Sequence, residues 1–184
     1  ILLIFDEVQT GIGITGKMWA FEHISIRPDI ISFGKKTQVC GVLANKEKFD
    51  EVPNNVFRES SRINSTFGGN FIDMLRFQLV MEVIEKENLV ENARVVGEYL
   101  LKGLQNLAQK HPEKISNARG KGLMCAIDLP TDKQRNDLRE ILFEEGLIIL
   151  SCGDLSLRFR PHLNVTKEEI QIALDKIESN INKI

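Results

Sequence analysis

Two short apolar runs that each lead into a charged residue most constrain the fold of this chain. The first, Ile1–Phe5, ends at Asp6, and the second, Ile30–Phe33, leads through one glycine into Lys35. Continuous apolar runs of this kind are typical of buried parallel strands. In open α/β sheets, sites form outside the carboxyl ends of the strands. The sequence therefore predicts an α/β fold that brings a carboxylate and an amine to one edge of a sheet.

A carboxylate and an amine at such an edge match the needs of a pyridoxal phosphate enzyme. In these enzymes a lysine forms a Schiff base with the cofactor, and an acid pairs with the pyridinium nitrogen. Here the acid would be Asp6, and the amine would be Lys35 or its neighbour Lys36. Because adjacent residues at a strand end point in different directions, only one of the two lysines can reach the cofactor.

Two nucleotide-binding motifs match the same region only in part. Residues Gly11–Lys17 resemble a phosphate-binding loop, but Met18 stands where that loop needs serine or threonine to hold magnesium. That loop should also precede the acidic strand rather than follow it. The glycines also match the spacing G-x-G-x-x-G of the dinucleotide fingerprint, but too few residues separate Gly16 from Pro28 for the crossover helix. We therefore interpret the glycines as residues that shape a loop.

The composition is that of an ordinary folded protein, with 42% hydrophobic and 27% charged residues. A net charge of −2 without a basic cluster argues against nucleic acid as a partner. No apolar run approaches the ~18 residues that cross a membrane, so no membrane partner is expected. Three scattered cysteines are too few for a disulfide framework. We expect Cys40 and Cys152 to be buried free thiols in a cytoplasmic protein.

Hydrophobic periodicity separates a strand-rich and loop-rich beginning from a mixed helical and strand-containing end. From Phe71, apolar residues recur at helical spacing and predict an amphipathic helix of ~15 residues. A second helix is expected from Val90 to His111. A β-α-β-β-α block follows, and its last helix begins with a capping box at Thr166. The natural domain boundary therefore lies within residues 71–92. Because Ile1 lies inside a strand that needs neighbours, we expect the C-terminal part of a longer protein.

The residues around the two apolar runs resemble the signature of the class III aminotransferases, which use pyridoxal phosphate. The resemblance rests on Phe5–Gly11, on Gly16, and on Pro28–Ile30 with Lys35 six residues after Asp29. It identifies Lys35 as the Schiff-base lysine and leaves Lys36 as a solvated neighbour. Most of the family has a glycine-rich run after the lysine. The L-lysine 6-aminotransferases within the family instead resemble this chain at Phe33–Gly41, Asn54–Phe57, Ser61–Asn70, Arg119–Cys125 and Leu157–Pro161.

This resemblance implies a pyridoxal-phosphate-dependent transferase fold of the aspartate aminotransferase type, an α/β fold. Residues 1–70 would be the C-terminal part of the cofactor-binding large domain, with the end of its sheet. Residues 71–92 would be a connecting helix, and residues 93–184 an α+β C-terminal small domain. The resemblance also implies a homodimer with shared active sites and small-molecule amino acid and 2-oxo acid substrates.

The resemblance assigns roles to residues at both strand ends. Asp6 would keep the pyridine nitrogen protonated. Lys35 would bind the cofactor and then move the proton between substrate and cofactor. Val8 would pack against the ring face, although plain core packing explains a valine equally well. Gln9 would hydrogen-bond near the ring hydroxyl, or would be an ordinary loop amide.

A glycine-flanked loop would complete the cofactor site in the same family pattern. Thr66, with Ser65 beside it, would contact the cofactor phosphate of the other subunit, and Asn64 would face the substrate. The structural alternative is that this loop caps the helix that begins at Phe71.

Two arginines near the end of the chain are candidates for binding the substrate. By the family pattern, Arg158 would bind the α-carboxylate, because a guanidinium contacts both oxygens at once. Arg160 lies two residues further along the same strand and points the same way, so the strand period does not separate the two. The three histidines show no metal-ligand spacing, and no metal site is expected.

The activity implied by the resemblance is transfer of the ε-amino group of L-lysine to 2-oxoglutarate, giving 2-aminoadipate 6-semialdehyde and glutamate. One alternative is another class III ω-aminotransferase, acting on ornithine or 4-aminobutyrate. A second alternative is that the chain by itself is a non-catalytic fragment or a binding module.

Overall fold

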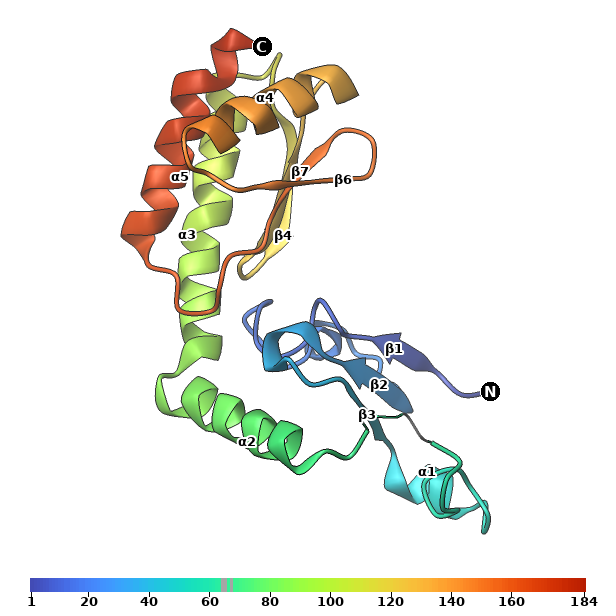
Figure 1. Cartoon of the computed structure of the whole chain (residues 1–184). Coiled ribbons are helices and arrows are strands. Elements are labelled where there is room, and N and C mark those ends of the chain that lie inside the picture. The colour runs from blue at the N-terminus through green and yellow to red at the C-terminus, as the bar shows by residue number, and fades with distance from the viewer. Residues whose placement is uncertain (64–65, 67) are drawn as a thin grey trace. The chain divides into compact units, whose positions relative to one another are not determined.

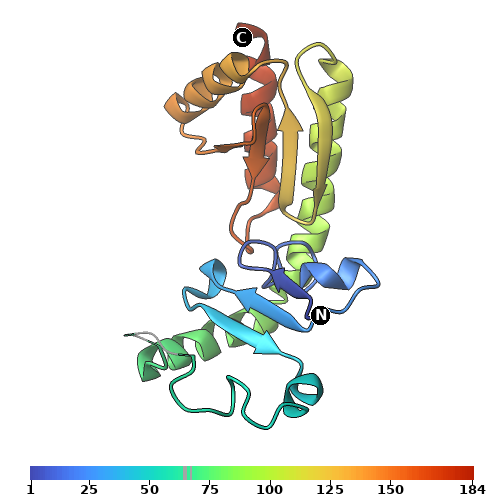
Figure 2. The same cartoon turned by 90° about the vertical axis from the view of Figure 1, so that its right-hand side faces the viewer.

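The computed structural model describes residues 1–63, 66 and 68–184 (Figures 1 and 2). The chain divides into two compact units. The first consists of residues 1–12 and 18–87, and the second of residues 13–17 and 88–184. No helix within the described ranges is both long and apolar enough to span a membrane. The domain limits expected at residues 70 and 92 stay a prediction.

The first unit contains a three-stranded sheet in the order β1-β2-β3, drawn in shades of blue and cyan in Figure 1. β1 (Ile4–Asp6) is parallel to β2 (Ile30–Phe33), and β3 (Gly41–Ala44) is antiparallel to β2. β1 begins at Ile4 rather than at Ile1, and its early residues are exposed because β2 alone pairs with it in the described structure. The parallel pairing of β1 and β2 places their carboxyl ends at one edge of the sheet.

The helical elements of this unit are η1 (Ala20–His23), η2 (Lys35–Thr37), α1 (Lys46–Asp50) and α2 (Phe71–Lys86). α2 occupies the predicted span, but it is not amphipathic within this chain. Ile84 is its buried residue, whereas Phe71 is 85% and Leu75 56% exposed. The sequence did not predict α1, which begins where the Asn45 side chain accepts the N–H of Lys48.

The second unit is a four-stranded antiparallel sheet with α3 and α5 side by side on one face (Figure 2). Its strands are β4 (Ser116–Lys121), β5 (Met124–Asp128), β6 (Leu150–Cys152) and β7 (Ser156–Phe159), in the order β4-β5-β7-β6. Its helices are α3 (Leu89–Lys110), α4 (Asp132–Glu144), α5 (Lys167–Asn180) and the short η3 (Ile181–Lys183). The core consists of fully buried aliphatic side chains, among them Leu100, Leu104, Ile127, Leu157 and Ile177.

Most elements of this unit match the predicted pattern, and the exceptions have local causes. Thr166 and Glu169 form the expected capping box at the start of α5. The first strand after α4, β6, begins only at Leu150, because the Leu147 N–H still donates to the Leu142 carbonyl at the end of α4 (2.8 Å). β4 was not predicted, since its residues are mostly polar and it is an edge strand of the sheet.

The three cysteines have different environments. Cys125 is buried, Cys152 is partly exposed and Cys40 is exposed. The prediction of burial is therefore wrong for Cys40, which directly precedes β3, an outer strand of the described sheet. It is also not met by Cys152, which is only partly buried. Among the residues that the structure describes, no three His, Cys, Asp or Glu side chains are grouped to hold a metal ion.

Candidate active site

Asp6 and Lys35 lie at the same edge of the sheet in the first unit. Asp6 is the last residue of β1 and is opposite Ser32 of β2. Lys35 follows the end of β2 after Gly34 and begins η2. Since β1 and β2 are parallel, both side chains belong to the carboxyl edge, where sites of α/β sheets form.

The surroundings of Asp6 hold the pKa of its carboxyl group below the ordinary value. The largest cause is the Val8 N–H, which donates to Oδ1 at 3.0 Å. The Ser32 hydroxyl donates to the same oxygen at 3.0 Å, and the positive charge of Lys35 acts in the same direction. An acid that stays ionised is what pairing with a protonated pyridine nitrogen requires. The donor set at Asp6 therefore fits pyridoxal phosphate.

Lys35 occupies a backbone conformation that residues other than glycine rarely adopt. Its φ is +54°, and Gln38 at the other end of the turn has a φ of +55°. The Gln38 N–H donates to the Lys35 carbonyl at 2.9 Å, and the buried Thr37 donates its hydroxyl to the Val39 carbonyl at 2.7 Å. Such strained residues persist where their surroundings hold them, and they cluster at functional sites. The side chain of Lys35 is exposed to solvent at the carboxyl edge of the sheet.

Glu7 is a buried residue at this edge to which the sequence assigned no role. Its side chain is 2% exposed. Oε2 accepts the Thr10 hydroxyl at 2.8 Å and the Ala20 N–H at 2.9 Å, and Oε1 accepts the Phe21 N–H at 2.8 Å. The carboxylate thus ties the end of β1 to the first residues of η1 and fixes the start of the loop after β1. An acid directly after an apolar strand was the available signal, but its burial could not be predicted from it.

The loop after β1 carries two of the predicted cofactor residues, Val8 and Gln9. Both are partly exposed, and both belong to the same unit as Asp6 and Lys35. The main-chain carbonyl of Gln9 accepts a hydrogen bond from Nζ of Lys36 at 2.8 Å. The expectation that Lys36 is merely solvated is therefore wrong, because its ammonium group contacts this loop.

The predicted phosphate and substrate loop is described only in part. Thr66 is exposed and lies in a turn. Asn64 and Ser65 lie outside the described residues. α2 is capped by Asn70, whose side chain accepts the N–H of Ile72 at 2.8 Å. Thr66 is therefore not the cap of this helix.

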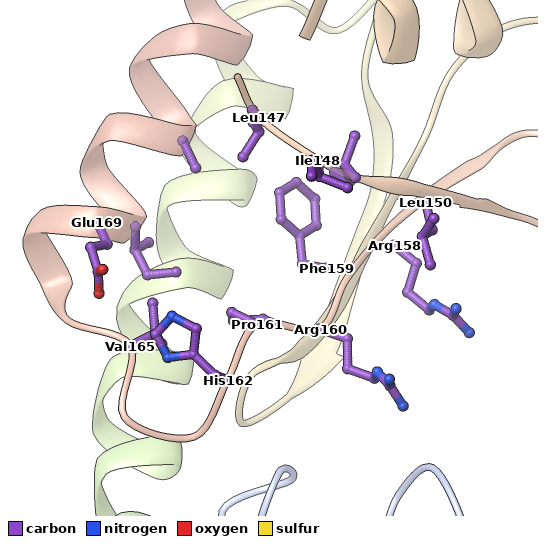
Figure 3. Close-up of a pocket in the computed structure, with 13 residues that line it drawn as sticks. Leu147, Ile148, Leu150, Arg158, Phe159, Arg160, Pro161, His162, Val165 and Glu169 are labelled. Carbon is purple, nitrogen blue, oxygen red and sulfur yellow. The ribbon is translucent and has the colours of Figure 1, made fainter. Parts of the chain in front are cut away.

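Arg158 and Arg160 belong to the second unit, at the end of β7. Arg158 is partly exposed, and Arg160 is exposed. Figure 3 shows both guanidinium groups extending in the same direction, as the strand period predicts. They lie at the rim of a pocket of about 400 Å³ with an apolar lining that includes Phe159 and Ile170. The geometry within this unit does not separate the two arginines.

Comparison with known proteins extends the likeness over the whole chain. The sequence profile of the family Aminotransferase class-III matches residues 1–181. An L-lysine-epsilon aminotransferase of Streptomyces clavuligerus is 46% identical over 184 residues, which are 100% of this chain and 40% of that protein. A 4-aminobutyrate aminotransferase of Dictyostelium discoideum is 36% identical over 184 residues, covering 99% of this chain and 36% of that protein.

The solved structures agree with this likeness. A lysine aminotransferase from Mycobacterium tuberculosis has a TM-score of 0.92 and 49% identity, covering 97% of this chain and 41% of that one. The predicted α/β fold is thereby confirmed. The chain spans about 40% of the length of the lysine aminotransferases that it matches, which agrees with the expectation of one part of a longer enzyme. The chain belongs to the class III aminotransferases, whose cofactor is pyridoxal 5′-phosphate.

Proposed function

We propose that the complete enzyme containing this chain transfers the ε-amino group of L-lysine to 2-oxoglutarate. The products would be 2-aminoadipate 6-semialdehyde and glutamate. The observation that carries this proposal is the 46% identity to a lysine aminotransferase over 184 residues, against 36% to a 4-aminobutyrate aminotransferase over an equal length. The resemblance of Phe33–Gly41 to the lysine enzymes supports the same choice.

Asp6 would bind the ring nitrogen of the cofactor and hold a proton on it. When bound, pyridoxal phosphate supplies a conjugated ring that accepts the electron pair released as a substrate C–H bond breaks. A carboxylate favours the protonated ring only if it is itself ionised. The lowered pKa of Asp6, caused first by the Val8 N–H and then by Ser32, supports this role.

Lys35 would hold the cofactor through Nζ and would then move a proton. In the first half-reaction Nζ would take the proton from the substrate carbon that bears the transferred amino group and pass it to the cofactor. In the second half-reaction it would carry a proton from the cofactor to the keto acid carbon. The position of Lys35 beside Asp6 at the carboxyl edge, together with its strained backbone, supports this assignment. Val8 would contact the ring face, and Gln9 would bind near the ring hydroxyl.

Arg158 would bind the α-carboxylate of the substrate. A planar guanidinium contacts both carboxylate oxygens, which fixes the direction of the substrate as well as its position. The similarity of Leu157–Pro161 to the lysine aminotransferases supports Arg158 over Arg160. Asn64 would contact the substrate from its own loop.

A second subunit is part of the proposal. By resemblance, Ser65 and Thr66 would contact the cofactor phosphate of the partner subunit, and Thr66 is exposed. α2 exposes large apolar side chains such as Phe71 and Leu75, which suit burial against another part of the enzyme. The homodimer and the cytoplasmic location stay predictions, and the mass of the full-length enzyme in solution tests the first.

The choice of amino donor provides the test of this function. Glutamate formation would be measured with the full-length enzyme, 2-oxoglutarate and either lysine, ornithine or 4-aminobutyrate. We expect kcat/KM for lysine to exceed the other two by about tenfold or more, a difference of about 1.4 kcal/mol in transition-state binding. A higher value for ornithine or 4-aminobutyrate would assign the enzyme to that donor.

A further inference from the structure

The ammonium group of Lys36 joins two loops at the carboxyl edge of the sheet. Its Nζ donates to the Gln9 carbonyl at 2.8 Å, although the two residues are 27 positions apart. Lys36 belongs to η2, which follows β2, whereas Gln9 belongs to the loop that follows β1. The contact therefore fixes the turn that carries Lys35 relative to the loop that carries Val8 and Gln9.

A lysine is chemically suited to this connection. An ammonium group has three N–H donors and no acceptor, so it can donate a hydrogen bond to a main-chain carbonyl, which only accepts. Hydrogen bonds with an ionised donor are roughly twice as strong as neutral ones. Lys36 is partly buried, which shields the bond from competing water. Its long aliphatic stem lets the charged end cross from one loop to the other.

The turn that carries Lys35 needs external support because its backbone is strained at both ends. Lys35 and Gln38 both have φ values near +55° without being glycine. The bonds from Gln38 to Lys35 and from Thr37 to Val39 act within the turn and its flank. The bond from Lys36 instead reaches a separate segment, so it resists movement of the whole turn against the sheet edge.

We propose that Lys36 is a positioning residue that holds the turn of Lys35 against the loop after β1. The inference rests on the proposed function, in which Lys35 Nζ binds the cofactor and moves the substrate proton. Without the bond, the Lys35 turn would sample positions away from the sheet edge. A misplacement of about 1 Å in a group that moves a proton lowers the rate by as much as about 100-fold.

The test compares Lys36→Met with Lys36→Arg in the full-length enzyme. Methionine keeps most of the unbranched stem but cannot donate, whereas arginine restores a charged donor. The matched control is Lys46→Met, since the Lys46 side chain is 85% exposed and pairs with Asp50 on the short helix α1. We expect Lys36→Met to lower kcat by about 10- to 100-fold with KM for lysine within about threefold, and Lys36→Arg to recover most of the loss.

A second measurement does not depend on activity. Hydrogen exchange of the Gln38 amide, which donates to the Lys35 carbonyl, would be followed in the cofactor-free enzyme. We expect exchange to be at least about tenfold faster in Lys36→Met than in the wild type or Lys46→Met, the effect of losing a bond to a charged group. If Lys36→Met does not fold, the Lys36→Arg variant carries the test, with near-normal exchange expected.

The outcomes separate this inference from the proposed function. Unchanged Gln38 exchange and unchanged kcat in Lys36→Met would overturn the positioning role, and so would equal losses in Lys36→Met and Lys36→Arg. A wild-type enzyme that does not transaminate lysine would overturn the proposed function. In that case the exchange comparison still decides whether Lys36 holds the turn.

Discussion

Replacing Glu7 with glutamine would test how the loop after β1 is held. Oε2 of Glu7 accepts two hydrogen bonds, from Thr10 and Ala20, and Oε1 accepts one from Phe21. Glutamine has almost the same shape, but one of its two terminal groups is an NH₂ that cannot accept a hydrogen bond. Because the side chain is 2% exposed, water cannot easily replace a lost partner.

The contacts allow the cost of Glu7→Gln to be worked out. The better amide orientation places the NH₂ at Oε1, where it faces the Phe21 N–H, and keeps the two bonds at Oε2. A buried N–H left without an acceptor costs about 1–3 kcal/mol, and each of the two remaining bonds loses about 0.5 kcal/mol with the charge. The loop should therefore be less stable by roughly 2–4 kcal/mol.

Hydrogen exchange in the full-length enzyme measures this loss of stability directly, because the amide protons of Ala20 and Phe21 are the ones that Glu7 accepts. Exchange at these two amides should become about 30- to 700-fold faster in Glu7→Gln, since 1.4 kcal/mol corresponds to a factor of ten. Glu22→Gln is the matched control. Glu22 is exposed, and its Oε1 accepts the Trp19 N–H at 2.7 Å, which an amide oxygen can also do.

The control should change exchange at Ala20 and Phe21 by less than about threefold, which corresponds to about 0.6 kcal/mol. If Glu7→Gln has no larger effect than Glu22→Gln, the buried carboxylate does not hold this loop.

Further substitutions in the full-length enzyme test the proposed site. Lys35→Ala should abolish the visible absorbance of the bound cofactor, whereas Lys36→Ala should keep it. Loss of this absorbance in Lys36→Ala would instead identify Lys36 as the Schiff-base lysine. Asp6→Asn should lower turnover by about 100-fold or more, because the ring proton loses its charged partner. Because the pKa of Asp6 is lowered in the folded protein, its ionised carboxylate stabilises the fold at pH values above the ordinary aspartate pKa. This stabilisation is lost as the pH falls through the lowered pKa. Acid unfolding curves of Asp6→Asn should therefore lack this pH-dependent contribution. If one arginine serves both substrates, Arg158→Ala should raise KM for lysine and for 2-oxoglutarate by about 10- to 100-fold, the effect of losing about 1.5–3 kcal/mol of binding. An unchanged KM for both in Arg158→Ala, with a large rise in Arg160→Ala, would move the role to Arg160.

Patterns within short segments predicted several of the elements. The apolar runs before Asp6 and Lys35 formed parallel strands, and the helical spacing from Phe71 formed α2. The capping box at Thr166 was also found where expected. Each pattern lies within a short segment, so that segment's own sequence indicates the element, although β1 and β2 pair only after the chain between them has folded back.

Features that depend on a partner outside their own segment could not be predicted. β4 is polar, and its strand conformation comes from pairing with β5. Glu7 looked like any acid after a strand, since its donors at Ala20 and Phe21 are 13 and 14 residues away. Lys36 was expected in solvent because Gln9, its acceptor, is distant in sequence.

Following the transferred nitrogen atom shows which amino group of lysine the enzyme removes. The full-length enzyme would be incubated with 2-oxoglutarate and lysine that carries nitrogen-15 at either its ε- or its α-amino group, and the glutamate would be analysed by mass spectrometry. Transfer of the ε-amino group predicts labelled glutamate from ε-labelled lysine and unlabelled glutamate from α-labelled lysine. Labelled glutamate from α-labelled lysine, or no glutamate from lysine at all, would contradict it.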